Sequence, residues 1–315
     1  MRFKKPFFWD LKKPNLYSHI LNPLTFLIKI NNFLLNMKVK KLSQKLKTIC
    51  IGNIYVGGTG KTPTTIKLYN ILKELKIKTS TAKKIYNSQK DELIILREKT
   101  SLISEKNRAE IIKKATEENK QLLIFDDGLQ DKYVSYDLQF VCFDTNNWIG
   151  NGRLIPAGPL RESLKSLKKY DGVFLKKEGQ NNTEPIINLI RSNNPNIKIF
   201  TTNYKAKNLN QFNRSDNYLI FSGIGSPKSF RNLLEKNNLR IIKEIIFPDH
   251  YQYNEKDIKK IQNLAHQNNA KIITTEKDFV KIKHYNNQNI NFLEIELEIN
   301  SEDELLRFIK SKLYE

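Results

Sequence analysis

The sequence predicts an α/β protein with a mainly parallel sheet, covered by helices on both faces. Apolar strand-like runs alternate with helical stretches along most of the chain, which is the pattern of βα units. A glycine-rich turn joins an early strand to a helix, and polar side chains gather where several later strands end. At 315 residues the chain is long enough to bury a substantial core and to form two lobes.

The glycine-rich turn spans residues 51–63 and lies between an apolar run and a helix expected over 63–75. Glycine has no Cβ, so the turn can bring consecutive backbone N–H groups onto one phosphate. Lys61 would reach the β and γ phosphates, and the Thr62 hydroxyl a magnesium ion. The helix that follows places the positive N-terminal end of its dipole beside the phosphates. The turn is therefore predicted to be a phosphate-binding P-loop with these nucleotide-contact residues: Tyr55, Val56, Gly57, Gly58, Thr59, Gly60, Lys61 and Thr62.

Tyr55 departs from the general P-loop pattern, which asks for glycine at that position. Its backbone N–H remains available, but its bulk must point away from the nucleotide. The alternative is a strand-to-helix turn that is merely rich in glycine. The joint occurrence of strand, turn, Gly-Lys-Thr and helix favours the P-loop.

Composition and charge restrict the class of partner. Hydrophobic residues make up 39% and charged residues 28% of the chain, which disfavours disorder. The net charge of +21 favours an anionic partner, such as a nucleotide, a nucleic acid or an acidic lipid. The two cysteines, Cys50 and Cys142, lie in apolar strand-like runs and are expected to be buried, reduced thiols of a cytosolic protein.

The N-terminal arm, residues 1–45, carries much of the positive charge. Residues 1–50 hold eleven Lys or Arg and one Asp, a net charge of +10. No cleavable signal is evident, because the apolar run at 6–9 is too short. A helix expected over 24–37 has one polar stripe on an otherwise apolar surface, formed by Thr25, Lys29, Asn32 and Asn36.

This helix is too short and too polar to span a bilayer, but it can lie in the membrane interface with its lysines facing anionic head groups. The alternative is a docking helix packed on its own domain. Nucleic acid is a weaker candidate partner, because Phe7, Phe8 and Trp9 form one block instead of alternating with basic residues.

Two series of elements follow the P-loop. The first has strands expected at 77–82, 122–125, 138–143 and 172–175, with a helix at 106–118. The second has strands expected at 218–221, 241–247, 271–275 and 290–297, with helices at 227–237, 255–266 and 302–313. An Asn-rich segment at 179–213 is the expected join. These observations predict three parts: a membrane-interface arm at 1–45, a P-loop core at 46–205 and a C-terminal α/β lobe at 206–315.

Polar clusters follow several of these strands. Asp126 and Asp127 end an apolar strand 65 positions after Lys61, as expected of a Walker B element that orders magnesium. The loop at 151–162 is fixed by glycine and proline and presents arginines that can clamp phosphate oxygens, together with Glu162 as a further metal contact. Solvated arginines on a surface loop are the alternative.

Taken together, the motifs resemble those of the tetraacyldisaccharide 4'-kinase family of lipid A biosynthesis over nearly the whole chain. The motifs that carry the resemblance occur in the order of that family: Gly52-Asn53, Gly57-Gly-Thr-Gly-Lys-Thr-Pro63, Asp126-Asp-Gly-Leu-Gln130, Asn151-Gly-Arg-Leu-Ile-Pro-Ala-Gly-Pro-Leu-Arg-Glu162, Phe221-Ser-Gly-Ile-Gly225, Phe247-Pro-Asp-His250 and Thr275-Glu-Lys-Asp278. The loop from Arg153 to Glu162 is the most specific of them.

The resemblance implies a P-loop NTPase-like kinase that moves the γ-phosphoryl group of ATP, with Mg²⁺, to the 4'-hydroxyl of a tetraacylated glucosamine disaccharide 1-phosphate, forming lipid IVA. It also implies a peripheral location on the cytoplasmic face of the bacterial inner membrane, with no nucleic acid and no obligate protein partner.

The resemblance also assigns roles to residues. Asp91, which on its own would be part of an ordinary exposed acidic pair, corresponds to the proposed general base, and His250 to its partner. The residues that correspond to metal-site carboxylates are Asp126, Asp127 and Glu162. Those that correspond to basic residues near the phosphates are Arg108 and Arg161, and Arg161 would balance charge in the transition state.

Departures from the family pattern occur at three places. Thr81-Ala-Lys-Lys84 stands where the family usually shows Ser-Arg-Gly-Tyr, and the segment before Asp91 is shortened. Asp131 replaces a usual histidine, and Tyr55 replaces a small hydroxyl residue.

Two other classes of function remain as alternatives. A P-loop GTPase or metallochaperone would need a guanine-reading Asn-Lys-x-Asp, and Thr275-Glu-Lys-Asp278 has its lysine one place too late. A nucleotide-binding membrane scaffold would use the basic arm without turnover, and product formation separates it from a kinase.

Overall fold

The computed structural model describes residues 5–27, 30, 46–86, 89–131, 134–178 and 182–314. It divides the chain into two compact units. Unit 1 comprises Met1–Ile85, Thr100–Asn203 and Ile299–Glu315, and unit 2 comprises Tyr86–Lys99 and Tyr204–Glu298. In sequence, unit 2 therefore consists of one short piece and one long piece, separated by more than 100 residues of unit 1.

An eight-stranded sheet carries the P-loop, with the strand order β12-β7-β6-β5-β1-β4-β2-β3. Its strands are β1 (Lys47–Gly52), β2 (Thr79–Lys84), β3 (Leu102–Glu105), β4 (Leu122–Asp126), β5 (Leu138–Asp144), β6 (Gly172–Lys176), β7 (Lys198–Ala206) and β12 (Ile295–Ile299). The pairs from β7 through to β3 are parallel. Ile51 of β1 pairs with Asp126 of β4, so the strand that feeds the P-loop and the strand that ends in two carboxylates finish side by side.

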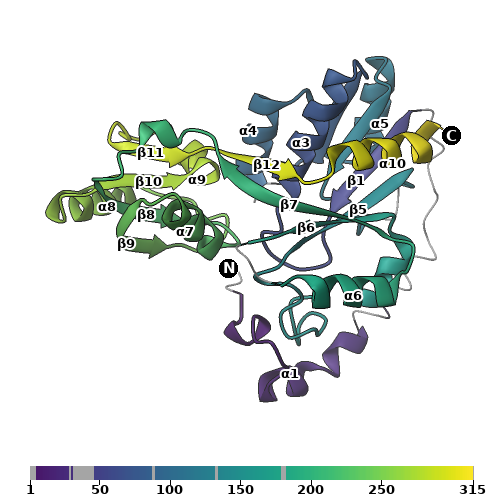
Figure 1. The fold of residues 1–315 in the computed structure, drawn as a ribbon, viewed down its shortest axis with the longest axis horizontal. Coiled ribbons are helices and arrows are strands. Elements are labelled where there is room, and N and C mark those ends of the chain that lie inside the picture. The colour runs from purple at the N-terminus through teal and green to yellow at the C-terminus, as the bar shows by residue number, and fades with distance from the viewer. Residues whose placement is uncertain are drawn as a thin grey trace. The chain divides into compact units, whose positions relative to one another are not determined.

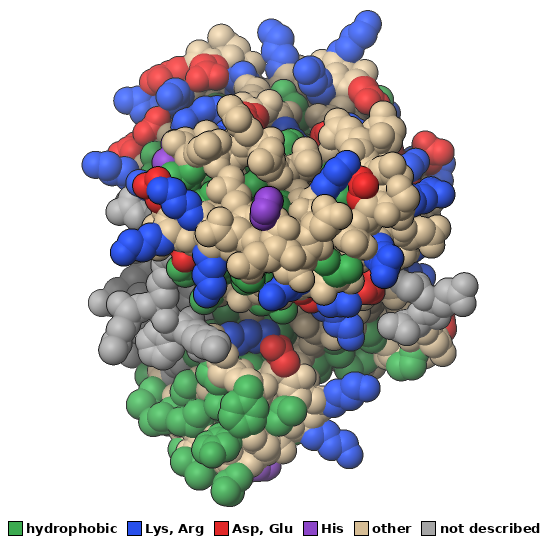
Figure 2. Space-filling model, turned by 90° about the vertical axis from the view of Figure 1, so that its left-hand side faces the viewer, with side chains coloured by type: hydrophobic (Ala, Val, Ile, Leu, Met, Phe, Trp, Pro, Cys, Tyr) green, Lys and Arg blue, Asp and Glu red, His purple; other side chains and the backbone are tan. Residues whose placement is uncertain are grey.

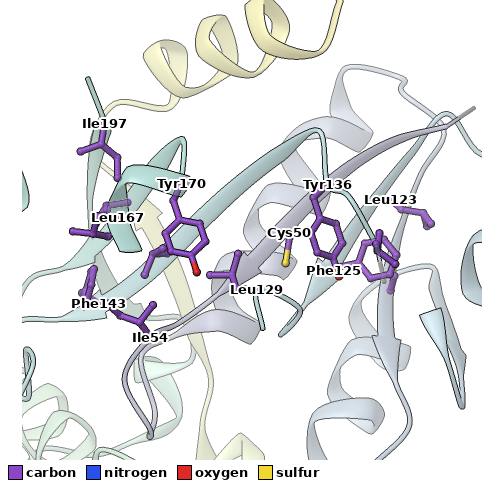
Figure 3. Packing of buried hydrophobic residues seen from close by; sticks show 14 of the residues in the cluster. Cys50, Ile54, Leu123, Phe125, Leu129, Tyr136, Phe143, Leu167, Tyr170 and Ile197 are labelled. Atoms are coloured by element: carbon purple, nitrogen blue, oxygen red, sulfur yellow. The ribbon is translucent and has the colours of Figure 1, made fainter. Parts of the chain in front are cut away.

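Helices cover both faces of this sheet. On one face α5 (Arg108–Glu117), the 3-10 helix η3 (Leu164–Lys169) and α6 (Glu184–Asn193) pack on a buried cluster that includes Cys50, Phe125 and Tyr136 (Figure 3). On the other face lie α3 (Lys61–Glu74) and α10 (Glu302–Tyr314), where the Phe308 ring lies 6.2 Å from that of Phe140 in β5. Figure 1 shows α10 and α6 on opposite sides of β6.

Unit 2 has a parallel four-stranded sheet with the order β11-β10-β8-β9. The strands are β8 (Asn217–Ser222), β9 (Arg240–Ile246), β10 (Lys271–Thr275) and β11 (Ile290–Leu293), and the helices are α4 (Lys90–Lys99), α7 (Pro227–Lys236), α8 (Glu255–Gln267) and α9 (Glu276–Ile282) (Figure 1). Alternation along β8 sends Tyr218 and Ile220 to the cluster under α7, and Leu219 and Phe221 to the cluster under α8. Helix α4 packs against α9.

The predicted fold class is confirmed: the protein is α/β, with a mainly parallel sheet between helices. The Asn-rich segment at 179–213, the expected join, contains the boundary between the units at Asn203 and Tyr204, and α6 and β7 form within its described part. Ile190 and Phe200 of these two elements are buried in unit 1, and this burial stabilises regular structure despite the asparagines.

The units also differ from the predicted parts at 46–205 and 206–315. Residues 86–99 join unit 2, because α4 packs on α9, and α10 joins unit 1, because it packs on β5. In the N-terminal arm, α1 (Leu16–Leu21) precedes the expected helix, of which residues 24–27 and 30 are helical. Lys29, Asn32 and Asn36 lie outside the described residues. Among the described residues, no helix combines the length and the apolar character that a bilayer span requires.

Candidate active site

The P-loop connects β1 to α3 in the predicted place. Gly57 and Gly60 have φ values of +145° and +85°, which side chains with a Cβ rarely adopt, and α3 begins directly after Gly60. The Asn53 amide donates to the Gly57 carbonyl at 3.1 Å, which holds the start of the turn. The N-terminal N–H groups of a helix have no partner within it, so the turn and the start of α3 together form an anion site.

Two carboxylates lie against this turn from the end of β4. The Thr62 hydroxyl donates to Oδ2 of Asp126 at 2.9 Å, and Nζ of Lys61 lies 3.7 Å from Oδ2 of Asp127. Oδ1 of Asp126 is buried and accepts no hydrogen bond from the residues that the structure describes. A hard cation such as Mg²⁺ prefers oxygen ligands, so the Thr62 hydroxyl and this carboxylate fit a magnesium ion that arrives with nucleotide phosphates.

The loop at 151–162 is attached to the P-loop by backbone contacts. Tyr55 and Leu160 form an antiparallel bridge, and the Arg161 N–H donates to the Ile54 carbonyl at 2.7 Å. The Arg161 guanidinium then lies 3.4 Å from Oδ1 of Asp127 and donates to the Gln130 amide oxygen at 3.2 Å. Arg161 is therefore positioned beside the anion site by backbone contacts and does not extend freely into solvent.

Glu162 points to the same region but already accepts two hydrogen bonds. Its Oε1 accepts from the Gln130 amide at 3.0 Å and from the Tyr170 hydroxyl at 2.9 Å. Burial, together with the Glu162 charge, raises the pKa of Tyr170. Glu162 can take part in a metal site only if these donors stay in place or exchange for the metal.

Arg108 lies at the same end of the sheet and is almost fully buried. Its guanidinium pairs with the Asp131 carboxylate and donates to the Asp127 carbonyl. These contacts hold the backbone that carries Asp127.

The Tyr55 ring packs against Gly57, where an added Cβ would lie 3.0 Å from the ring, and its hydroxyl end reaches the N-terminal segment. The ring is fully buried, and its hydroxyl donates to Asp10 at 2.7 Å and contacts Lys5. The loop at 151–162 binds the same segment: the Asn151 amide donates to the Phe8 carbonyl at 3.1 Å and to the Ser18 hydroxyl at 2.7 Å. The described part of the arm is thus anchored to the loop that carries Arg161.

The anchored segment exposes an unusual amount of apolar surface. Figure 2 shows it as a continuous hydrophobic area at the lower edge of the molecule. Thr25, from the predicted polar stripe, is buried and donates to the Asn22 carbonyl at 2.7 Å. The large apolar side chains that are exposed here are Phe7, Leu11, Leu16, Tyr17, Ile20, Leu24, Phe26, Leu27 and Ile30.

Unit 2 brings Asp91 and His250 together although 159 positions separate them in sequence. Asp91 lies in the first turn of α4 and is 2% exposed, so it is not an ordinary exposed acid. Nδ1 of His250 lies 3.1 Å from Oδ2 and 3.2 Å from Oδ1 of Asp91. His250 has a φ of +58°, and its N–H donates to the Gly223 carbonyl at 3.1 Å, which links it to the Phe221–Gly225 motif.

Two lysines of α9 complete the surroundings of Asp91. Nζ of Lys281 lies 3.4 Å from Oδ2 of Asp91, and Nζ of Lys277 lies 3.8 Å from the same atom. Burial alone would raise the pKa of Asp91, but the His250 hydrogen bond and the Lys277 charge outweigh it and lower the pKa. Nζ of Lys277 also lies 3.4 Å from Nε2 of His250. This contact favours the tautomer in which Nδ1 carries the proton and donates to Asp91.

The Thr275–Asp278 motif stabilises the start of α9 and its contact with Gly223. The Thr275 hydroxyl caps α9 by accepting from the Asp278 N–H at 3.1 Å. The Asp278 carboxylate is fully buried and accepts from the Gly223 N–H at 2.8 Å and from Lys281 at 2.8 Å. Asp278 is therefore occupied by the protein, which argues against a guanine-reading role.

Sequence reasoning missed residues whose partners are distant along the chain. Lys83, Gln130 and Tyr170 lie beside the carboxylates of unit 1, and Lys277 and Lys281 beside Asp91. A signal existed for Lys83 alone, because it directly follows the predicted strand at 77–82, and a lysine that is buried where such a strand continues must be paired.

Both cysteines are buried free thiols that form no disulfide, as predicted. Burial raises the pKa of Cys142 to about 12. Neither cysteine is therefore suited to thiolate chemistry.

Comparisons with known proteins give a consistent result. A family model described as tetraacyldisaccharide-1-P 4'-kinase matches residues 17–314. The tetraacyldisaccharide 4'-kinase of Pelagibacter ubique is 42% identical over 97% of this chain and 96% of its own, and that of Rickettsia conorii is 34% identical over 95% of both. Among solved structures, LpxK from Aquifex aeolicus in complex with ATP superposes with a TM-score of 0.68 at 22% identity, covering 95% of this chain and 100% of that one.

Proposed function

This chain belongs to the tetraacyldisaccharide-1-P 4'-kinase family. We propose that the residues around the P-loop bind the phosphoryl donor and that the residues around Asp91 and His250 act on the acceptor. The protein is an ATP-dependent kinase of lipid A biosynthesis that acts on a lipid disaccharide 1-phosphate with ATP and Mg²⁺. The transfer moves the γ-phosphoryl group to the 4'-hydroxyl of the tetraacylated disaccharide. The roles of individual residues are assigned below from their contacts.

The residues around the P-loop hold the donor. Backbone N–H groups of the turn and Lys61 bind the phosphates, and Arg161 balances charge on the transferred group. Mg²⁺, when bound with ATP, neutralises phosphate charge; Thr62 and Asp126 would hold it, with Asp127 and Glu162 as the further carboxylates. The convergence of these groups on one turn is the observation that carries the assignment.

The residues of unit 2 act on the acceptor. Asp91 accepts the proton of the 4'-hydroxyl as the new P–O bond forms, while the bond between the γ-phosphorus and the bridging oxygen breaks and ADP leaves. His250 orients the Asp91 carboxylate through Nδ1, and Lys277 fixes the tautomer of His250 through Nε2. The low pKa of Asp91 keeps the carboxylate ionised and makes it a weak base, which fits phosphoryl transfer through a loose transition state.

The proposed role of the P-loop residues is tested by incubating the purified protein with Mg²⁺, γ-labelled ATP and the tetraacylated disaccharide 1-phosphate. The wild type should label the disaccharide, and Lys61→Met should lose at least about 100-fold in turnover because Lys61 serves phosphate charge. Lys73→Met, an exposed lysine of the same helix, is the matched control and should be unchanged. Nucleotide binding without a labelled product would support the scaffold alternative instead.

We further propose that the exposed apolar surface of the N-terminal segment holds the protein peripherally on the cytoplasmic face of the bacterial inner membrane. The substrate is acylated and ATP is cytoplasmic, so an enzyme that uses both must work at that surface. Apolar side chains that would otherwise face water gain stability in the membrane interface, and the +10 charge of residues 1–50 favours anionic head groups.

Vesicle co-sedimentation tests this location. A variant with Ile20, Phe26 and Leu27 changed to Ser should stay in the supernatant with vesicles of anionic lipid, whereas the wild type pellets. Leu189→Ser removes an apolar side chain that is exposed elsewhere in unit 1, and is the matched control. Equal pelleting of wild type and triple variant would place the membrane contact elsewhere.

A further inference from the structure

Lys83 is a buried cation that contacts the carboxylate next to the P-loop. It lies near the carboxyl end of β2 and is 1% exposed. Its Nζ lies 2.8 Å from Oδ2 of Asp126, the same oxygen that accepts the hydrogen bond of the Thr62 hydroxyl at 2.9 Å. One carboxylate oxygen is thus shared by an internal ammonium and by the hydroxyl that follows the P-loop lysine.

The sheet register dictates this contact. β2 pairs in parallel with β4, and Ala82 is level with Phe125, so the next residues, Lys83 and Asp126, are neighbours at the strand ends. A buried ammonium is costly unless it is paired, and the Asp126 carboxylate is the partner that the structure provides for Lys83.

The charges of the site explain what such a lysine does. The carboxylates assigned to the metal site are Asp126, Asp127 and Glu162. The cations paired with them are Lys83, Lys61, Arg161 and Lys169. These seven side chains have a formal sum of +1. A free divalent cation therefore meets no excess negative charge from them, and the affinity of oxygen sites for such cations depends on ligand charge.

Given the magnesium site proposed above, we propose that Lys83 is a positioning residue that makes metal binding depend on the nucleotide. Its ammonium neutralises Asp126 and holds it as the acceptor for Thr62. Mg²⁺ then enters with the phosphates of ATP, which supply the missing negative charge, and does not bind to the empty enzyme.

The test uses Mn²⁺ as the probe and measures by equilibrium dialysis the Mn²⁺ that stays with the protein, with and without ATP on both sides of the membrane. Without nucleotide, wild type should bind Mn²⁺ at least about tenfold more weakly than Lys83→Met, because the variant leaves Asp126 uncompensated. With ATP, wild type should bind Mn²⁺, and the two proteins should differ less than about threefold. Lys84→Met is the matched control, since adjacent strand residues point to opposite faces, and should behave as wild type.

Equal nucleotide-free affinities in wild type and Lys83→Met would overturn the inference while leaving the kinase assignment intact. Failure to bind Mn²⁺ even with ATP would instead count against the metal site itself. If Lys83→Met does not fold, Lys83→Met with Asp126→Asn removes both charges and should recover the folded state. The wild-type protein alone also tests the inference. If it binds Mn²⁺ as tightly without ATP as with ATP, the inference is overturned.

Discussion

The pair Asp91 and His250 allows a quantitative test of how the proton acceptor works. We expect Asp91→Asn to lower turnover by about 10²–10⁴-fold, the usual contribution of a positioned acid or base, which corresponds to about 2.7–5.4 kcal/mol. Asn keeps the size of the side chain but cannot accept the proton as a carboxylate does.

The effect of His250→Ala follows from the other partners of Asp91. The variant removes the hydrogen bond at 3.1 Å, but Lys281 at 3.4 Å and Lys277 at 3.8 Å remain to compensate the carboxylate. The loss is therefore that of one charge-assisted hydrogen bond, about 1.5–3 kcal/mol, or roughly 10–100-fold in turnover. In the double variant there is no carboxylate left to orient, so its activity should equal that of Asp91→Asn alone.

The assay is single-turnover phosphoryl transfer at saturating ATP, together with measured ATP affinity and thermal unfolding for each variant. Lys281 keeps its Asp278 partner at 2.8 Å in Asp91→Asn, so the variant should remain folded. The reasoning is refuted if the two losses multiply in the double variant, or if either substitution weakens ATP binding as much as it slows transfer.

Three further predictions concern stability and access. The pKa of Asp91 is lower in the folded state than in the unfolded state, so its contribution to stability is complete above about pH 4 and is lost as pH falls through the folded-state pKa. Urea titrations measure the difference in unfolding free energy between wild type and Asp91→Asn. This difference should be constant from pH 7 to 5 and shrink below about pH 4. Cys142, buried and with its pKa raised to about 12, should react with a disulfide reagent at pH 8 only after unfolding, and fast reaction of the native protein would contradict its placement. Asn151→Ala removes donors to Phe8 and Ser18, at a cost of about 1–3 kcal/mol, and should expose residues 5–27 to limited proteolysis, whereas an unchanged cleavage pattern would show that other contacts suffice.

The parts of the site that depend on consecutive residues were accessible from the sequence. A P-loop is a local structure, so its strand, glycines, Lys61 and helix could be read from one stretch. Asp126 and Asp127 followed from the same reasoning, since an apolar strand that ends in two acids needs no knowledge of distant residues. The resemblance added Asp91 and His250, which no local pattern distinguishes.

The parts that depend on tertiary contacts were not accessible. The lysines beside Asp91 come from α9, and whether Lys277 faces Asp91 or solvent depends on how α4 packs there. β7 was missed because the segment around it, at 179–213, is rich in asparagine, and the burial of Phe200 that stabilises β7 is visible only in the folded sheet. The N-terminal segment was predicted to be interfacial, but not that Asn151 would hold it against the loop that carries Arg161.

The insertion of α4 into unit 2 has a consequence for biosynthesis. Lys99 at the end of α4 hydrogen-bonds Glu276 of α9, 177 residues later in the chain. At a translation rate of about 5–20 residues per second, α4 leaves the ribosome roughly 9–35 s before that partner has been made. During this interval its apolar face, with Leu93 and Leu96, has no native surface to cover it. We expect nascent chains that end near residue 250 to depend on a chaperone that binds this helix, and chains extended past residue 299 to be released from it.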